Sequence, residues 1–413
     1  MSYSEVFRTR GVKPLVSAMV LARFGGQAYG LILVLFALDR FHSPALAGLV
    51  GLVGILPGLG LSPIAGALLD RFRRSTLVVV DYLLGALTGL TLALLAVTGT
   101  LNPPLLLLVA AISSLTIPFA LAGPRSLLPM LLERRLWDRG NAIDSATLRL
   151  TSILGPALGG LVVAWVGATA AVAAVGATWM LAGLFLTRVH EPPVTPPESH
   201  VLSESWQGLR YVLRNRVLRN LSVVMPLANI TMGILLVALP VLVLTRLHGG
   251  PAQVGLLWSV AGLMAAAGNV TAGRVRTEGR ENRIMAAGMA LSALPLLLVA
   301  GTPSLLLAAA GMALFGLCSG PVDVAMFGLR LRASDSAWFG RAISISIAIS
   351  FAGNPIGSGL AGPLIGWGVG PAIVVAALAS LGAGVLAWPL LRPAAVTTVP
   401  PAVLREEEVP AAV

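Results

Sequence analysis

Long apolar segments follow one another through almost the whole of this sequence, with short polar turns between them. Most of them reach the roughly 20 residues that an α-helix needs to cross the apolar layer of a bilayer. Membrane-spanning β-strands would instead alternate in hydrophobicity over about ten residues. A soluble domain carries about 25% charged residues, whereas 11% of this chain is charged and 56% is hydrophobic. The sequence therefore predicts an all-α polytopic membrane protein.

Twelve spans fit this pattern, and one longer connection, residues 188–219, separates them into two sets of six. We expect an N-terminal six-helix bundle over 1–187, a C-terminal six-helix bundle over 220–391 and a disordered cytoplasmic tail over 392–413. The expected spans lie near residues 14–38, 44–69, 75–99, 103–132, 142–167, 169–188, 220–245, 252–273, 284–301, 303–329, 341–366 and 371–391.

The chain has a formal net charge of +11, and its basic residues are concentrated in alternate loops. Basic residues precede the first span and follow each even-numbered span up to the tenth, whereas Arg40 and Arg246 are the only strong bases in the alternate loops. Because basic loops stay in the cytoplasm, we expect both termini there, in a multi-pass protein of the inner (cytoplasmic) membrane. The bases that follow the tenth span are Arg330, Arg332 and Arg341. This topology accounts for the charge without nucleic acid as a partner.

The connection 188–219 begins with a proline-rich stretch, 190–197, which cannot be helical throughout. From Trp206 to Leu221, apolar residues then recur at steps of three and four, with arginines between them. This spacing predicts an amphipathic helix that lies on the cytoplasmic surface of the membrane. A regulatory or partner-binding helix is the alternative.

Short motifs recur in the two sets of spans. The Gly-Pro of 155–156 in span five matches the Asn-Pro of 354–355 in span eleven. The segment 123–126 in span four matches 320–323 in span ten, since both begin with Gly-Pro. The two offsets are nearly equal, at 199 and 197 residues. We therefore expect the two halves to be structural repeats.

A short charged turn joins spans two and three, and it contains Gly66, Asp70, Arg71, Arg73 and Arg74. This turn resembles the Gly-x-x-x-Asp-Arg-x-Gly-Arg-Arg pattern of the major facilitator superfamily, with Arg73 where the family has glycine. The resemblance implies the major facilitator fold, in which two pseudosymmetric six-helix bundles enclose a central cavity. It also implies that Gly66 packs against span eleven and that Asp70 and Arg74 latch the cytoplasmic end closed.

A simple physical argument supports the latch. A carboxylate near a helix N-terminus gains up to about 1 kcal/mol, and a bias of this size is enough to shift two states of similar free energy. The alternative is that the charges of the turn only set topology, although three bases would do so without an acid.

Span five carries Gly155, Pro156, Gly159 and Gly160. The proline removes one backbone donor and the glycines allow close helix contact, so the helix can bend and pack tightly. The segment is similar to the end of the motif that marks exporters of the family. The linker sequence 208–215 also resembles sequences of the drug and siderophore efflux (drug:proton antiporter) branch. A simple kink is the alternative.

Ionisable residues at membrane depth mark a substrate or ion path by default, because they are costly to place there. Arg23 and Gln27 are four residues apart in span one and share a helix face. The family places spans one, four, seven and ten around the cavity, so we expect Arg125 and Asp323 to face each other across it. The further polar candidates for substrate contact are Asn229, Thr231, Asn269 and Asn354, and for each of them a hydrogen bond between helices is the alternative.

Two interpretations of Asp323 stay open. It takes up and releases a proton during the cycle, while Arg23 or Arg125 tunes it or binds an anionic group. Alternatively, it forms a permanent buried ion pair with an arginine that holds the halves together.

The motifs of other energy sources and of enzymes are missing from the sequence. It has no Gly-Lys-Ser/Thr nucleotide loop and no His-Glu-x-x-His, and its single cysteine, Cys318, has no partner for a disulfide. We therefore expect a transporter rather than an enzyme, with no cofactor or metal and a proton gradient as its energy source. The expected partners are a small-molecule substrate and the lipid bilayer, and the chain is expected to be a monomer.

The favoured function is proton-coupled export of a small amphipathic or partly anionic molecule by alternating access. An importer or facilitator of a metabolite without proton coupling is the alternative. A membrane sensor or scaffold, with the linker helix as its output, is the alternative of another class. The charges of the cavity argue against this last function.

Overall fold

The computed structural model describes residues 3–191, 201–274, 278–334 and 339–392, with all their side chains except those of 63, 67, 70, 201–205 and 339–342. The described chain is helical almost throughout and contains no strand. Most of the proline-rich stretch 190–197 and of the tail 392–413 lies outside it. The elements are α1 (Tyr3–Arg8), α2 (Val12–Phe41), α3 (Pro44–Val53), α4 (Leu56–Arg71), α5 (Arg74–Val97), α6 (Pro103–Ser114), α7 (Ile117–Leu131), η1 (Arg134–Leu136), α8 (Trp137–Leu186), α9 (Val201–Arg214), α10 (Arg216–Val241), η2 (Leu242–Arg246), α11 (Pro251–Gly273), α12 (Glu281–Gly301), α13 (Leu305–Ala333), α14 (Phe339–Phe351), α15 (Gly353–Gly366) and α16 (Val369–Leu390).

Eleven helical stretches of the described chain are long and apolar enough to cross a membrane, and one of them, α8, is long enough to do so twice. Its 50 residues would measure about 75 Å at 1.5 Å a residue, more than twice the roughly 30 Å apolar layer. At Gly167 the backbone leaves the helical conformation with a φ of 80°, which glycine adopts without steric cost. The chain turns there, so α8 contains spans five and six. The predicted all-α membrane fold of twelve spans is confirmed.

Spans two, four and eleven are each built from two helices. Pro57 and Pro118 lie in the first turns of α4 and α7, where proline fits but cannot continue a preceding helix. Span two is thereby divided between α3 and α4, and span four between α6 and α7. Span eleven is divided at Ala352, between α14 and α15. These three spans can therefore change direction inside the membrane.

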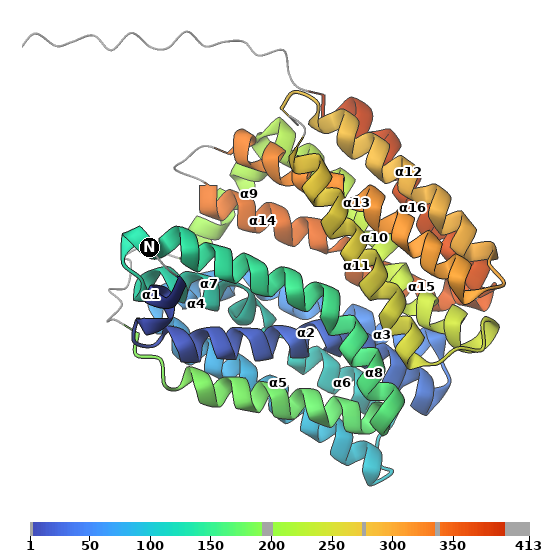
Figure 1. Ribbon diagram of the computed structural model, residues 1–413, viewed down its shortest axis with the longest axis horizontal. Helices are drawn as coiled ribbons and strands as arrows, with labels where there is room; N and C mark the ends of the chain where they lie inside the picture. The colour runs from blue at the N-terminus through green and yellow to red at the C-terminus, as the bar shows by residue number, and fades with distance from the viewer. Residues whose placement is uncertain (1–2, 192–200, 275–277, 335–338, 393–413) are drawn as a thin grey trace, which may run out of the picture.

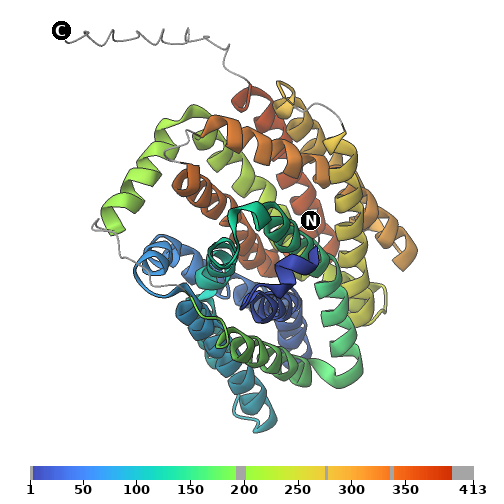
Figure 2. The same ribbon diagram turned by 60° about the vertical axis from the view of Figure 1, so that its left-hand side comes forward.

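Two bundles lie side by side in Figure 1, with α2–α8 in the lower part and α10–α16 in the upper part. Figure 2, which looks more nearly along the helices, shows the same division. Two pairs of helices join the bundles, because α8 packs against α11 and α3 packs against α15. Each pair takes one helix from each bundle.

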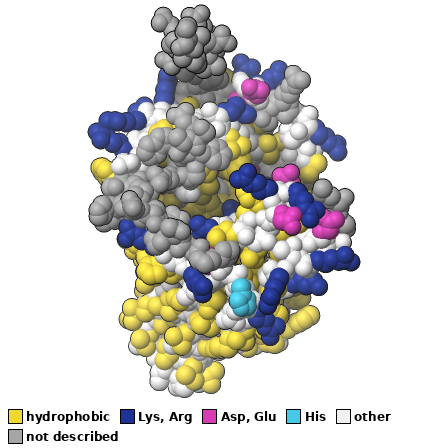
Figure 3. All heavy atoms as spheres, turned by 90° about the vertical axis from the view of Figure 1, so that its left-hand side faces the viewer, with side chains coloured by type: hydrophobic (Ala, Val, Ile, Leu, Met, Phe, Trp, Pro, Cys, Tyr) yellow, Lys and Arg dark blue, Asp and Glu magenta, His cyan; other side chains and the backbone are white. Residues whose placement is uncertain are grey.

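The bundles share one core at one end of the molecule and have separate cores at the other. We call the end that carries Arg71, Arg73 and Arg74 the basic end, because Lys and Arg side chains gather there (Figure 3). On the basic side each bundle has its own core, one containing Leu15 and the other Met285. On the opposite side one core contains residues of α2, α3, α10 and α15. Figure 3 shows the surface hollowed between the bundles at the basic end.

Glycines bring the joined ends into close contact. A Cβ at Gly160 of α8 would lie 2.4 Å from the Pro251 carbonyl oxygen of α11. A Cβ at Gly255 of α11 would lie equally near the Pro156 carbonyl oxygen, at 2.4 Å. The contact of α3 with α15 is as close, because a Cβ at Gly48 would lie 2.4 Å from a backbone oxygen of α15. The helices of the two bundles therefore meet backbone against backbone.

The linker helix α9 ends just before α10 begins, with Asn215 between them. The Asn215 side-chain oxygen accepts hydrogen bonds from the N–H groups of Val217 and Leu218 at 3.0 and 3.2 Å, and its amide nitrogen donates to the Ala333 oxygen at 2.7 Å. Asparagine is among the best residues for capping a helix N-terminus. The linker therefore contains an amphipathic helix, α9, as predicted, but this helix ends at Arg214, and the periodic stretch from Trp206 to Leu221 is divided between α9 and α10. Because α9 packs against α4, α10 and α14, it touches both bundles.

The close contact between the bundles can be tested by enlarging Gly160. Gly160→Leu forces side-chain atoms into the α11 backbone, and overpacking of this kind costs about 1–3 kcal/mol. The thermal unfolding midpoint of the purified protein is expected to fall accordingly. Gly60→Leu is the matched control, because a Cβ at Gly60 would meet no atom within 4 Å. Equal midpoints for the two variants would contradict the contact.

Candidate functional site

The turn between spans two and three is two residues long, because α4 ends at Arg71 and α5 begins at Arg74. Arg74 holds the turn against neighbouring helices. Its Nε donates to the Leu69 oxygen at 3.3 Å, and its Nη1 lies 3.0 Å from the Met130 sulfur of α7. Arg73, at the place of the family's glycine, is exposed. The turn is thus anchored within its own bundle.

The contacts that the resemblance implies for this turn are absent or lie outside the described residues. A Cβ at Gly66 would meet no atom of the described chain within 4 Å, so no described side chain of span eleven packs against Gly66. The separation of the bundles at the basic end accounts for this open space. The side chain of Asp70 and those of 339–342, at the start of α14, lie outside the described residues.

A carboxylate that is distant in sequence, that of Glu191, accepts hydrogen bonds from the end of the turn. Glu191 is buried, and its oxygens accept hydrogen bonds from the Arg74 N–H at 3.1 Å and from the Ser75 N–H and hydroxyl, both at 2.9 Å. The first N–H groups of a helix have no partner within it and carry partial positive charge. Glu191 therefore caps α5 and ties the end of span six to the turn. The sequence analysis missed this role, because a contact over 116 residues leaves no local pattern.

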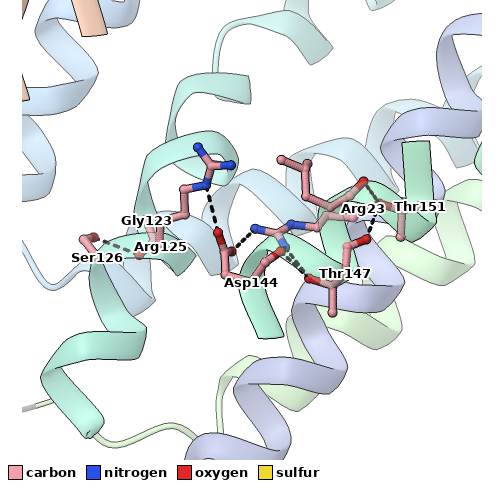
Figure 4. A network of polar contacts seen from close by, with 8 residues as sticks. Arg23, Gly123, Arg125, Ser126, Asp144, Thr147 and Thr151 are labelled. Atoms are coloured by element: carbon pink, nitrogen blue, oxygen red, sulfur yellow. Dashed lines mark hydrogen bonds and ion pairs between the residues drawn. The ribbon is translucent and has the colours of Figure 1, made fainter. Parts of the chain in front are cut away.

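An ion-paired cluster joins spans one, four and five (Figure 4). Arg23 of α2 forms an ion pair with Asp144 of α8. The Nη1 of Arg23 also donates to the Asp144 carbonyl oxygen at 2.9 Å and to the Thr147 hydroxyl at 2.5 Å. The side chains of Arg23 and Asp144 are only 15% and 13% exposed. Arg23 is thus bound firmly to one side of the Asp144 carboxylate.

Arg125 of α7 approaches the other oxygen of the same carboxylate. Its Nε lies 3.2 Å from Asp144 Oδ2, and Figure 4 shows its two terminal nitrogens pointing away from Asp144. The Arg125 side chain is 52% exposed, and within the described ranges no acceptor contacts those nitrogens. The structure therefore brings Arg23 and Arg125 together on Asp144, whereas we expected Arg125 to face Asp323.

The sequence analysis did not single out Asp144. A signal was present, because Asp144, Thr147 and Thr151 follow one another at three and four residues. That spacing places three polar groups on one face of an otherwise apolar helix. Such a stripe indicates a polar partner on a neighbouring helix, but it does not identify Arg23 as that partner.

The glycines of span five lie against the helix that carries Gln27. A Cβ at Gly155 would lie 2.5 Å from the Gln27 Cβ, and a Cβ at Gly159 would lie 3.1 Å from the Ala28 Cβ. Pro156 sits inside α8, and the helix continues through it. Gly155 and Gly159 thus bring α8 against α2, while Gly160 brings it against the other bundle. The Gly-Pro motif is the point where α8 packs on both sides.

The C-terminal bundle contains a cavity of about 80 Å³ between α10, α12, α13 and α16. Two predicted site residues, Asn229 and Asp323, line it together with Thr231 and Ser319. The Asn229 amide donates to the Met225 oxygen of its own helix at 2.9 Å. Asp323 is exposed, and it forms no ion pair or hydrogen bond with any residue that the structure describes. An exposed carboxylate without a fixed partner can exchange a proton with water.

The basic residue nearest to Asp323 along α13 is Arg330, and it is buried. Its Nε donates to the Ser346 hydroxyl at 3.2 Å and another of its nitrogens to the Ser350 hydroxyl at 2.5 Å. We predicted Arg330 as a loop base that sets topology, which is wrong because α13 continues to Ala333 and α14 covers the side chain. Its positive charge acts on Asp323.

The charge of a second arginine acts on Asp323 from the other bundle. With the Asn269 amide oriented to satisfy both its neighbours, its oxygen accepts from Arg149 Nη1 of α8 at 2.9 Å and its nitrogen donates to the Gly320 oxygen at 2.5 Å. The charge of Arg149 acts on Asp323. Arg149 therefore links the bundles next to the free carboxylate.

The remaining candidate, Asn354 of α15, has a side-chain oxygen without a hydrogen-bond partner in the described chain.

Comparison with known proteins finds transporters. The family model of the Major Facilitator Superfamily matches residues 15–274. The uncharacterised MFS-type transporter y4rN of Sinorhizobium fredii is 35% identical over 388 residues, which cover 93% of this chain and 96% of that protein. The multidrug efflux pump Tap of Mycolicibacterium fortuitum is 26% identical over 85% of this chain and 89% of its own. The enterobactin exporter EntS of Citrobacter koseri is 28% identical over 85% of each chain.

Solved structures share the fold. A crystal structure of the nucleoside transporter NupG aligns with a TM-score of 0.73 and 14% identity over 92% of this chain and 99% of its own. A bacterial homologue of the human lysosomal transporter Spinster, in an inward-facing and unoccupied conformation, aligns with a TM-score of 0.72 and 15% identity over 94% and 97%. At these identities the likeness shows the fold alone.

The cap on α5 can be tested by removing the Glu191 carboxylate. Glu191→Ala is expected to destabilise the protein by about 1–2 kcal/mol, because the first N–H groups of α5 lose their acceptor. The readout is the thermal unfolding midpoint in detergent. Glu191→Gln keeps an acceptor without the charge, so its midpoint should lie between those of the wild type and Glu191→Ala. Glu133→Ala removes an exposed acid at the same end and is the control. A midpoint for Glu191→Ala no lower than that control would contradict the cap.

Proposed function

This chain belongs to the Major Facilitator Superfamily of transporters, and we propose that it exports a small amphipathic or partly anionic molecule in exchange for protons. Two relatives support the direction, since Tap is named a multidrug efflux pump and EntS an enterobactin exporter. Both align over most of this chain. The charged groups at membrane depth support a solute path rather than a sensor.

The arrangement of the bundles supports alternating access. They meet through close helix contacts at one end and have separate cores at the other. Rocking about the joined end would close the basic end and open the opposite one. We assign the basic end to the cytoplasm, because basic loops stay there. The structure then corresponds to the inward-open state.

Asp323 is the observation that carries proton coupling. Its carboxylate is exposed at membrane depth and has no ion pair within the described residues. When it is ionised, it attracts Arg149 of the other bundle, and when it is protonated, that attraction is lost. Protonation therefore changes the free energy of bringing the bundles together. A coupling ion must change the difference in free energy between two conformations of the transporter in this way.

Asp323→Asn tests the coupling, because asparagine keeps the size of the side chain but cannot carry the proton. A screen by thermal shift first identifies compounds that stabilise the purified protein. These compounds are then added to energised everted vesicles that contain a pH-sensitive dye. The wild type is expected to release protons as each compound enters, and the variant to release at least tenfold fewer while still binding the compound.

Asp39→Asn is the control, since Asp39 is an exposed acid near the C-terminal end of α2. It should release protons as the wild type does. Unchanged proton release in Asp323→Asn at every pH would refute coupling through this residue. Compound entry without a pH gradient would favour the uncoupled facilitator instead, and entry only into right-side-out vesicles would favour import.

The latch that the resemblance assigns to Asp70 is a further part of the proposal. Asp70→Asn removes the charge that would attract the N-terminus of α14, so the basic end should stay open for a larger share of the time. A cysteine pair across α4 and α14, in a Cys318→Ser background, reports closure by its disulfide yield. We expect a lower yield in Asp70→Asn with the compound still bound. An unaltered yield would count against the latch.

A further inference from the structure

We infer that Arg125 binds a carboxylate group of the transported molecule, through the two nitrogens that point away from Asp144. This inference names the substrate class of the proposed transporter, and it rests on that function. It makes a single negative charge on an otherwise apolar molecule the feature that the N-terminal bundle recognises.

The charge of the cluster is the first argument. Two arginines, Arg23 and Arg125, share the single carboxylate of Asp144. The cluster therefore carries a net charge of +1 within the membrane-spanning helices, where an uncompensated charge is costly. One negative charge from a ligand would neutralise it, whereas a cation would raise the cost.

The division of donors is the second argument. Arg23 is largely enclosed, and its terminal nitrogens contact the Asp144 carboxylate, the Asp144 carbonyl oxygen and the Thr147 hydroxyl. Within the described residues, Arg125 contacts Asp144 through its Nε. A guanidinium has five N–H donors, and those on its terminal nitrogens meet no acceptor in the described part of the chain. The excess positive charge is therefore available on Arg125 alone.

The geometry is the third argument. The ion pair with Asp144 holds one edge of the Arg125 guanidinium, and Figure 4 shows the opposite edge turned away from the cluster. Two parallel N–H groups match the two oxygens of a carboxylate, and such paired bonds are among the stronger ones in proteins. A guanidinium that is already fixed loses little freedom when the ligand binds.

The position of α7 is the fourth argument. It packs against α2, α4, α5 and α8, all in its own bundle. The Arg125 side chain is half exposed, and on the basic side the two bundles have separate cores. A ligand can therefore reach Arg125 while the basic end is open. Asp323 lies in the other bundle, so the anion site and the proton site are separate groups.

A matched pair of probes tests the inference on the purified full-length protein, without any proton gradient. The probes are 2-naphthoate and 2-naphthylmethanol, which share an apolar body and differ in charge. The shift of the thermal unfolding midpoint with concentration gives an apparent Kd. We expect 2-naphthoate to stabilise the wild type in a saturable manner and the alcohol to bind at least tenfold more weakly.

Variants of Arg125 decide whether that preference depends on its guanidinium. Arg125→Gln is expected to weaken 2-naphthoate binding at least tenfold and to leave the alcohol unchanged. Arg125→Lys keeps the charge without the paired donors, so its affinity for 2-naphthoate should lie between those of the wild type and Arg125→Gln. Arg40→Gln, which removes a base from the opposite end of α2, is the control and should bind as the wild type does.

Failure of this inference can be told apart from failure of the proposed function. Equal binding of 2-naphthoate to wild type and Arg125→Gln, equal binding of the two probes to the wild type, or no stabilisation at any soluble concentration would overturn the inference. Proton-coupled export of other compounds would be untouched by those results. Conversely, binding through Arg125 without compound-driven proton release in vesicles would uphold the anion site and overturn the coupled function.

Discussion

Backbone contact between the bundles, through α8 with α11 and α3 with α15, is the constraint on which the rest of this structure depends. It requires glycine, because the carbonyl oxygen of the facing helix occupies the space that a Cβ would need at Gly160 and Gly255. The tight glycine contacts lie on the side away from the basic end, where one core is shared, and two separate cores remain at the basic end. A joint at one end is what two rigid bundles need to rock against each other.

The two repeats use the same helices for different electrostatic tasks. In the N-terminal bundle, Arg125 of span four shares the Asp144 carboxylate with Arg23, and the cluster is positive. In the C-terminal bundle, the matching segment of span ten carries Asp323, and the charges of Arg149 and Arg330 act on it. An anion site in one bundle and a proton site in the other would let both ligands act on the same movement without competing for one group.

The apolar segments predicted the fold well, and the charged residues were predicted less well. Twelve spans and two sets of six follow from hydropathy, which depends on each segment alone. Arg330 was mistaken for a loop base, because a helix can continue past its apolar run and a neighbouring helix can cover the charge. Asn215 divides a stretch whose periodicity indicated one helix, since an N-terminal cap outweighs the spacing of apolar residues.

The sequence by itself determined how many times this chain crosses the membrane and which residues are costly to place there. Only the tertiary structure decided which partners those residues have, because Arg23 meets Asp144 across 121 residues and Glu191 meets α5 across 116. Burial in a membrane acts on each segment separately, so it can be predicted from local composition. An ion pair depends on where two helices come to lie, and that position is set by the packing of all their neighbours.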